Sequence, residues 1–234
     1  MDPAIDTVMA TAKNTKCRFN SYNLSRTDKL YTKWKKDRKK QNQYFTDDLF
    51  RAFYIEDLYS RRVDCFYSLL MFSNFNDNIL EFIRKCKNVT SFGCGAAPEV
   101  LAYIKFVRGQ LRCSKLNLRF IGYDSIGGWD IYIDALRRHL DNRVTFDFKN
   151  ETVDRYSVSR MTQRGVCLMS YPHWDGFENI WESLKSKFNL IIVLDVNVRR
   201  FHRTLRNSGY YFQFFNDNFE EFSSPKSFYY YFEQ

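Results

Sequence analysis

Two of the nine glycines in this chain, Gly93 and Gly95, lie where an apolar segment turns into a helical pattern. Glycines at such a turn let the backbone approach a ligand with no Cβ in between. The start of the following helix adds unpaired N–H groups and partial positive charge. The stretch VTSFGCGAAPEVLAYIKF, residues 89–106, therefore predicts a binding site. The alternative is a tight strand-to-helix turn that holds no ligand.

This turn does not match the common phosphate-binding patterns. A phosphate-loop enzyme needs a Lys followed by Ser or Thr after the second glycine, and neither is present here. A dinucleotide site needs Gly or Ala where Pro98 stands. Glu99 beside the turn would also repel a pyrophosphate. These features favour a nucleoside ligand that carries no phosphate chain.

An acidic residue, Asp124, ends the second predicted strand in the stretch IGYD. An acid at this strand end can accept two hydrogen bonds from ribose hydroxyls. Asp124 lies further beyond Gly95 than the usual distance of about 20 positions, and a polar insert at 109–115 accounts for much of the difference. The alternative role for Asp124 is a solvent-facing cap of the turn at 125–128.

The elements that must position these residues alternate between strand and helix from residue 88 onward. Strand patterns occupy 89–92, 118–124, 144–148, 166–171 and 190–196, with helical patterns at 98–108, 129–140, 177–188 and 198–207. Two aromatic strands follow, at 210–215 and 227–233. This order predicts a doubly wound α/β domain whose mostly parallel, seven-stranded sheet ends in an antiparallel C-terminal hairpin.

The first third of the chain has a different pattern. Residues 1–26 are polar and predict weak order, and helical spacing of apolar residues follows at 27–45, 47–60, 62–72 and 78–86. We therefore expect three parts. They are a basic, partly disordered or helical arm at 1–45, a helical extension that packs on the domain at 46–87, and the α/β domain at 88–234.

The combination of glycine turn, acid and strand order resembles the class I (Rossmann-like) S-adenosylmethionine-dependent methyltransferase family over roughly residues 88–234. SFGCGAAPE stands in the position of the family's first motif, and IGYD in that of its second. The resemblance implies S-adenosylmethionine as cofactor, with its methionine end at the turn, its ribose at Asp124 and its adenine near residues 146–148. The cofactor-binding residues that it implies are Ser91, Gly93, Gly95, Ala97, Asp124, Asp147 and Phe148.

Two positions depart from the family's pattern. The family usually has an acid where Ser91 stands, and often a third glycine where Ala97 stands. An active enzyme can tolerate either change. Together they leave open an alternative function, a catalytically inactive methyltransferase-like fold that serves as a binding or scaffolding module.

The end of the fourth predicted strand would face the methyl group to be transferred. SYPH, at 170–173, resembles a degraded form of the [DNS]-P-P-[YFW] motif of enzymes that methylate amino groups of bases. The resemblance implies catalytic roles for Ser170, which matches the motif, for Tyr171, which replaces its first proline, and for His173, which with Trp174 could supply the stacking ring. His173 as a general base and a loop without catalytic function are the alternatives.

The net charge of +9 is concentrated in residues 11–40, which hold eleven Lys or Arg and two Asp. Lys and Arg neutralise phosphates, and interleaved aromatic rings can stack on unpaired bases. We expect contact with nucleic acid here, and we favour RNA because RNA-modifying enzymes of this fold are numerous. The residues expected to make this contact are Lys33, Trp34, Lys35, Lys36, Arg38, Lys39 and Lys40. A nuclear-import signal and a solvated basic segment are the alternatives.

Other features restrict where the protein acts. The longest apolar run, CFYSLLMF at 65–72, is far shorter than the roughly 18–20 residues of a membrane span. The six cysteines and three histidines show no spacing typical of metal ligands or paired thiols. We therefore expect an intracellular protein, cytoplasmic or nuclear, that has RNA and another protein as partners, but no membrane and no metal. The main hypothesis is a methyltransferase that acts on RNA; one that acts on a small molecule or a protein would share the cofactor site.

Overall fold

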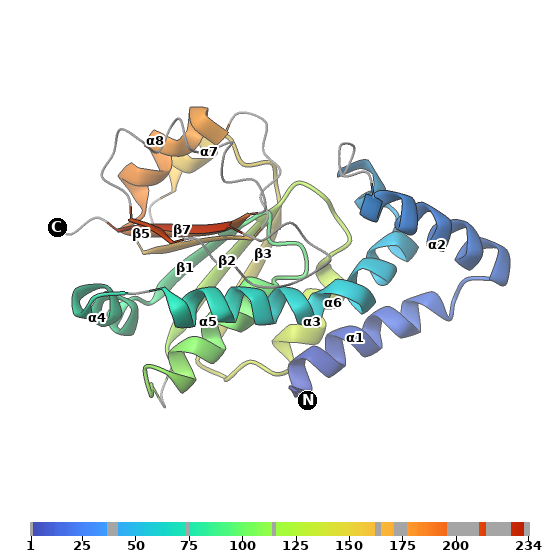
Figure 1. The fold of residues 1–234 in the computed structure, drawn as a ribbon, viewed down its shortest axis with the longest axis horizontal. Helices are drawn as coiled ribbons and strands as arrows, with labels where there is room; N and C mark the ends of the chain where they lie inside the picture. Colours follow the sequence, from blue (N-terminus) through green and yellow to red (C-terminus); the bar gives the residue numbers. More distant parts are fainter. Residues whose placement is uncertain are drawn as a thin grey trace.

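A parallel sheet forms the centre of the molecule (Figure 1). The computed structural model describes residues 2–36, 42–73, 75–113, 116–161, 165–170, 177–195, 211–213 and 226–231. Its parallel strands are β1 (Asn88–Phe92), β2 (Leu118–Asp124), β3 (Val144–Asn150), β4 (Val166–Ser170) and β5 (Leu190–Asp195). The predicted α/β class with five parallel strands is confirmed.

Beyond β5 the sheet continues with strands of opposite direction. β7 (Lys226–Tyr231) pairs antiparallel with β5, and β6 (Tyr211–Gln213) pairs antiparallel with β7. The complete order is β3-β2-β1-β4-β5-β7-β6. Chain order runs outward in both directions from β1, so the crossover after β3 returns the chain to the other side of β1. The carboxyl end of β1 is therefore the switch point where ligands bind in open α/β sheets.

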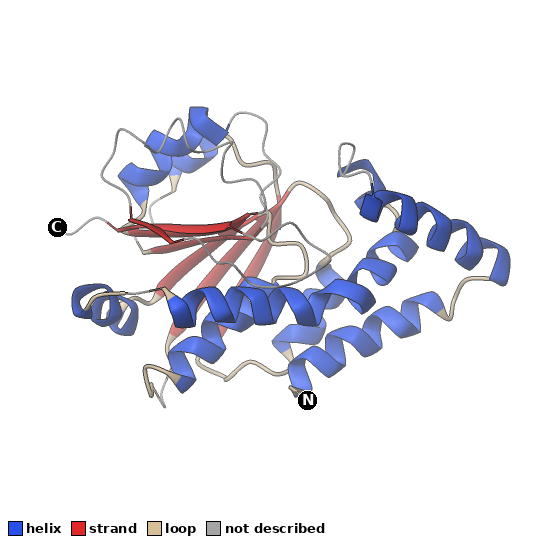
Figure 2. Ribbon diagram, in the orientation of Figure 1, coloured by secondary structure: helices blue, strands red, loops and turns tan. Residues whose placement is uncertain are grey.

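Helices cover both faces of this sheet (Figure 2). One face carries α3 (Asp48–Phe72), α5 (Pro98–Gly109) and α6 (Asp130–Arg137), and the other carries α7 (Arg155–Arg160) and α8 (Phe177–Lys187). The buried residues of β4 and β5 alternate between the two layers. For example, Leu168 belongs to the α3–α5 side, whereas Cys167 and Met169 belong to the α8 side. Central strands buried on both faces explain why these segments are apolar without interruption.

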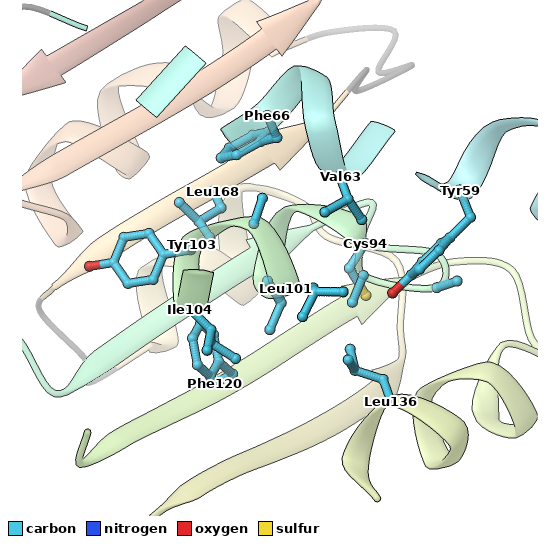
Figure 3. Packing of buried hydrophobic residues seen from close by; sticks show 14 of the residues in the cluster. Tyr59, Val63, Phe66, Cys94, Leu101, Tyr103, Ile104, Phe120, Leu136 and Leu168 are labelled. Atoms are coloured by element: carbon cyan, nitrogen blue, oxygen red, sulfur yellow. The ribbon is translucent and has the colours of Figure 1, made fainter. Parts of the chain in front are cut away.

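The core under α3 joins the N-terminal helices to the sheet. Val63 and Phe66 of α3 pack toward Leu101 and Ile104 of α5, which lie on Phe120 of β2 (Figure 3). α3 is a single helix of 25 residues that joins the predicted helical ranges 47–60 and 62–72. Arg61 and Arg62 are good helix formers and give the chain no reason to stop there.

The N-terminal segment is more ordered than its polar composition suggested. α1 (Pro3–Lys16) begins with Asp2, whose side chain accepts a hydrogen bond from the Ala4 N–H at 2.9 Å. Its apolar side packs against α3 and α6 through buried residues that include Val8 and Ala12. The expectation of weak order at 1–26 is therefore wrong, because a narrow stripe of small apolar residues is enough to dock a capped helix.

The remaining helices extend this layer. α2 (Ser21–Lys36) and the short helix η2 (Asn42–Thr46) pack on α3, and α4 (Asp77–Lys85) precedes β1. The predicted helix at 198–207 and half of the predicted strand at 210–215 lie outside the described residues. Because α1 and α2 contribute to the common core, removing residues 1–45 would expose it, and single substitutions are the better test of this segment.

A matched pair of substitutions tests the docking of α1. We expect Ala12→Asp to lower the free energy of unfolding by about 3 kcal/mol or more, because Ala12 is fully buried and an unpaired buried carboxylate costs several kcal/mol. Ala10 is exposed on the same helix, so Ala10→Asp should cost only the difference in helix propensity, about 0.7 kcal/mol. Urea unfolding followed by circular dichroism measures both. Equal effects would mean that α1 does not dock as the structure shows.

Candidate functional site

A cavity of about 380 Å³ lies at the carboxyl ends of β1, β2 and β4. Its floor is the loop after β1, the end of β2 and the loop after β3, and its roof comes from α3 with Trp34 and Phe45. The position is the switch point of the sheet, and the volume lies in the range of small-molecule sites. The cavity that the sequence predicted is therefore present, and the N-terminal helices form part of its wall.

The glycine turn has a backbone that favours glycine. Gly93 and Gly95 have φ angles of +63° and +50°, in the left-handed region. A Cβ at Gly93 would meet no atom within 4 Å, so this part of the backbone borders open space. A Cβ at Gly95 would lie 3.6 Å from the ring of Trp129. The turn therefore exposes bare backbone on one side and packs against an indole on the other.

Ala97 holds a left-handed backbone as well. Its φ and ψ are 59° and 47°, and it is the residue that precedes α5. An L-residue in this conformation costs about 1–2 kcal/mol. Strain of this kind tends to occur at functional sites. Ala97 therefore holds a backbone conformation that glycine adopts more easily.

Asp124 connects the second strand to the glycine turn. Its Oδ2 accepts a hydrogen bond from the Gly95 N–H at 2.8 Å, and its Oδ1 accepts one from the Ile126 N–H at 2.9 Å. The carboxylate also lines the cavity. Burial raises the pKa of Asp124, against the effect of these N–H groups and of the Trp129 indole. Each oxygen keeps acceptor capacity for a ligand hydroxyl, so Asp124 both caps the following turn and faces the cavity.

Trp129 closes the side of the cavity next to the turn. It is buried, and its ring centroid lies 5.8 Å from that of Phe45 and 6.2 Å from that of Tyr54. These three rings bring α6, η2 and α3 together around the turn. Their flat apolar surfaces can contact a heterocyclic ring.

Glu99 is the functional candidate that sequence reasoning missed. It is fully buried in the first turn of α5, and its Oε1 accepts a hydrogen bond from the Ser91 hydroxyl at 2.5 Å. Its Oε2 has no hydrogen-bond partner among the described residues, and the side chain lines the cavity. Burial raises the pKa of Glu99 to about 7, although the Ser91 hydrogen bond and the charge of Arg62 act in the other direction.

Ser91 lies next to the site and contacts Glu99, but it does not line the cavity itself. It is buried within β1 and uses its hydroxyl to hold Glu99. Ser170 was predicted as a catalytic residue and does line the cavity, at the last position of β4. Its Oγ is buried and has no partner among the described residues. Tyr171 and His173 lie outside the described residues.

Asp147 and Phe148 do not lie at the cavity. β3 continues to Asn150, two residues beyond its predicted end, so both residues fall inside the strand. The Asp147 side chain is 58% exposed and pairs with Arg119 at 3.6 Å, and Phe148 packs against the core. The loop after β3 meets the cavity at Glu151, Thr152 and Val153 instead. The predicted contact with the third-strand loop is therefore displaced along the chain.

The predicted nucleic-acid residues divide into three groups. Trp34 is 6% exposed, and its ring stacks on Tyr31 at 5.4 Å, so stacking of Trp34 on a base is contradicted. Lys35 pairs with Asp57 at 3.1 Å, whereas Lys33 and Lys36 are exposed. The others, Arg38, Lys39 and Lys40, lie outside the described residues. An aromatic residue in a basic segment can indicate either a helix face that packs on the core or a ring that stacks on a base. Here the ring of Trp34 packs α2 on the core.

In the described parts of the chain, no three or more His, Cys, Asp or Glu residues converge as a metal site would require. None of the described helices is long and apolar enough to cross a membrane.

Comparisons with solved structures give matches at low sequence identity. No protein-family model and no curated protein sequence matches the chain. A solved protein of Listeria monocytogenes, provisionally assigned as a class I S-adenosylmethionine-dependent methyltransferase, is 11% identical and has a TM-score of 0.48, with 97% of this chain and 87% of that one covered. Precorrin-6y C5,15-methyltransferase of Geobacter metallireducens is 11% identical and has a TM-score of 0.44, with 65% of this chain and 84% of that one covered. A human methyltransferase 10 domain-containing protein is 8% identical and has a TM-score of 0.44, with 76% of this chain and 82% of that one covered.

Proposed function

We propose that this protein is an S-adenosylmethionine-dependent methyltransferase. The observation that carries the proposal is the hydrogen bond between Asp124 and the Gly95 N–H, because it brings both predicted motifs to one wall of one cavity. The site fits a polar nucleoside ligand. Open space borders Gly93. The buried polar atoms of cavity-lining residues that have no partner among the described residues include Tyr59 Oη, Glu99 Oε2 and Ser170 Oγ.

Different residues of the cavity would contact different parts of the ligand. Asp124 would accept hydrogen bonds from the ribose hydroxyls, and the bare backbone at Gly93 would lie along the methionine end. Trp129 and the loop at 151–153 offer surfaces for the base. The bound cofactor supplies a methyl group on a sulfonium sulfur, which is reactive toward a nucleophile in line with the carbon–sulfur bond.

The protein's part in the transfer is to position the nucleophile. An effectively intramolecular reaction gains most from orientation and from the exclusion of water. Ser170 at the end of β4 has a buried hydroxyl that can accept a hydrogen bond from a donor group of the substrate or donate one to an acceptor. Trp34, Phe45 and Tyr54 line the same cavity with aromatic surface.

The substrate that we propose is RNA. The support is electrostatic: on α2 the basic side chains Arg26, Lys29, Lys33 and Lys36 are exposed. Of the aromatic rings on this helix, Tyr31 and Trp34 are buried, whereas Tyr22 is 73% exposed. Basic groups at this surface can neutralise phosphates. Base stacking by Trp34 is no longer part of the proposal, and the basic side chains alone carry it.

Neutralising two of these lysines tests the RNA proposal. We expect Lys33→Gln/Lys36→Gln to weaken binding of single-stranded RNA and to reduce the slope of log K against log salt by about 1.4, since each lost phosphate contact contributes about 0.7. Fluorescence anisotropy over a series of salt concentrations measures both. The control is Arg84→Gln/Lys85→Gln on α4, at the opposite end of α3 (Figure 1). Identical slopes for the two double variants would refute an RNA-binding face on α2.

A further inference from the structure

The glycine turn is followed by a carboxyl group in an unusual place. Glu99 is fully buried, yet one of its oxygens has no hydrogen-bond partner among the described residues. A buried polar atom without a partner costs about 1–3 kcal/mol, and more when the group is charged. Such an atom on a cavity wall is satisfied when a ligand supplies the missing hydrogen.

Ser91 determines how Glu99 faces the cavity. The Ser91 hydroxyl donates to Oε1 at 2.5 Å from the middle of the sheet, which leaves Oε2 as the unpartnered oxygen. Ser91 itself does not line the cavity, whereas Glu99 does. The position where related enzymes are expected to carry an acid thus holds a hydroxyl that orients an acid from the neighbouring helix.

We propose that Glu99 binds the α-ammonium group at the amino-acid end of the cofactor and that Ser91 is its positioning residue. The inference rests on the proposed function, because it assigns a residue to one end of that ligand. It places the carboxylate on the first turn of α5 instead of on β1. The departure at Ser91 is then a relocation of the acid and not a loss of it.

The charges around Glu99 favour a cationic ligand group. Arg62, Tyr54 and Tyr59 face it from α3, Ser91 from β1, Cys94 from the turn and Asp124 from β2. Burial raises the pKa values of both tyrosines and of Cys94, so these three are neutral near pH 7. With Glu99 ionised, this group of residues contains two carboxylates, Glu99 and Asp124, and one guanidinium, that of Arg62. An ammonium group on the ligand would compensate the excess negative charge.

The proposal makes ligand affinity depend on pH. The pKa of Glu99 is raised to about 7, so the carboxylate that attracts an ammonium group forms as pH rises through this value. Affinity for a ligand with the amino-acid end should therefore be about tenfold higher at pH 8 than at pH 6. A ligand without that end should show no such rise.

Two commercial ligands separate this inference from the proposed function. S-adenosylhomocysteine carries the amino-acid end, and 5′-methylthioadenosine has the same adenosine thioether without it. We expect Glu99→Gln to weaken S-adenosylhomocysteine by about 10- to 100-fold, the range of one charge-assisted hydrogen bond, and to leave 5′-methylthioadenosine within about twofold. Isothermal titration calorimetry of the full chain at pH 6, 7 and 8 measures both ligands.

Ser91→Ala provides a second variant with a distinct readout. The Ser91 hydrogen bond lowers the pKa of Glu99, so its removal should move the midpoint of the pH dependence of S-adenosylhomocysteine binding upward. A merely structural role of Ser91 would lower affinity at every pH without moving the midpoint. Binding of 5′-methylthioadenosine reports whether either variant keeps the cavity intact.

The outcomes are distinct. Wild-type protein that binds neither ligand would end the proposed function and the inference with it. The inference alone would be overturned if wild-type protein and Glu99→Gln bound S-adenosylhomocysteine equally tightly and the affinity of wild-type protein did not rise between pH 6 and pH 8. If Glu99→Gln does not fold, the difference between the pH profiles of the two ligands on wild-type protein decides.

Discussion

We expect Asp124→Asn to weaken the binding of S-adenosylhomocysteine by about 100-fold or more. Two hydrogen bonds from ribose hydroxyls to a charged group contribute about 1.5–3 kcal/mol each. The amide NH₂ would also face one of two backbone donors, the N–H of Gly95 or that of Ile126, which now bind the carboxylate at 2.8 and 2.9 Å. The substitution therefore removes ligand contacts and displaces the glycine turn. Isothermal titration calorimetry measures the loss.

Asp147→Asn is the matched control for this prediction. Asp147 lies on the neighbouring strand β3, is 58% exposed, and pairs with Arg119 away from the cavity. We expect the affinity of Asp147→Asn for S-adenosylhomocysteine to stay within about twofold of wild type, because distant surface substitutions act independently. A loss at Asp147 as large as that at Asp124, or no loss at either, would contradict the site assignment.

Phe66→Ala should lower the free energy of unfolding by about 3–5 kcal/mol, the usual cost of truncating a fully buried phenylalanine. Phe66 has no exposed surface and lies where α3 packs over α5 and the sheet (Figure 3). The cavity left there would weaken the contact that holds the N-terminal helices over the ligand site. Urea unfolding at 25 °C measures the change.

Phe72→Ala on the same helix is its control. Phe72 is 61% exposed at the last turn of α3, so the same truncation there should cost less than about 1 kcal/mol. Similar losses at the two positions would show that α3 does not dock through the face that carries Phe66. The pair thus reports on the packing of the helix and not on phenylalanine in general.

The parallel strands and the meeting of Gly95 with Asp124 were predictable because their signals are local. Alternating strand and helix patterns fix the parallel strands, since a strand–helix–strand unit has only one common handedness. The turn at Gly93 and Gly95 and the acid at Asp124 each end a strand, and parallel strands bring their carboxyl ends to one edge. The proximity of Gly95 and Asp124 follows from that geometry without any knowledge of side-chain packing.

The wall of the cavity was not predictable in this way. Trp34 and Phe45 reach it only through the packing of α2 and η2 on α3, which no local pattern specifies. The role of Glu99 depends on its burial and on the Ser91 hydroxyl eight positions earlier in the chain. A hydrophilic residue after a glycine turn gives no sign that it will be buried. Asp147 was misplaced because strand ends are uncertain by a few residues in sequence.

The central claim is that the cavity at the end of β1 binds an adenosyl sulfonium compound or its thioether product. Calorimetric titration of the wild-type chain with S-adenosylhomocysteine tests it most directly. We expect saturable heat with one ligand per chain and a matching rise in melting temperature. No heat and no thermal shift up to millimolar ligand would contradict it, and would favour a methyltransferase-like fold that serves as a binding or scaffolding module.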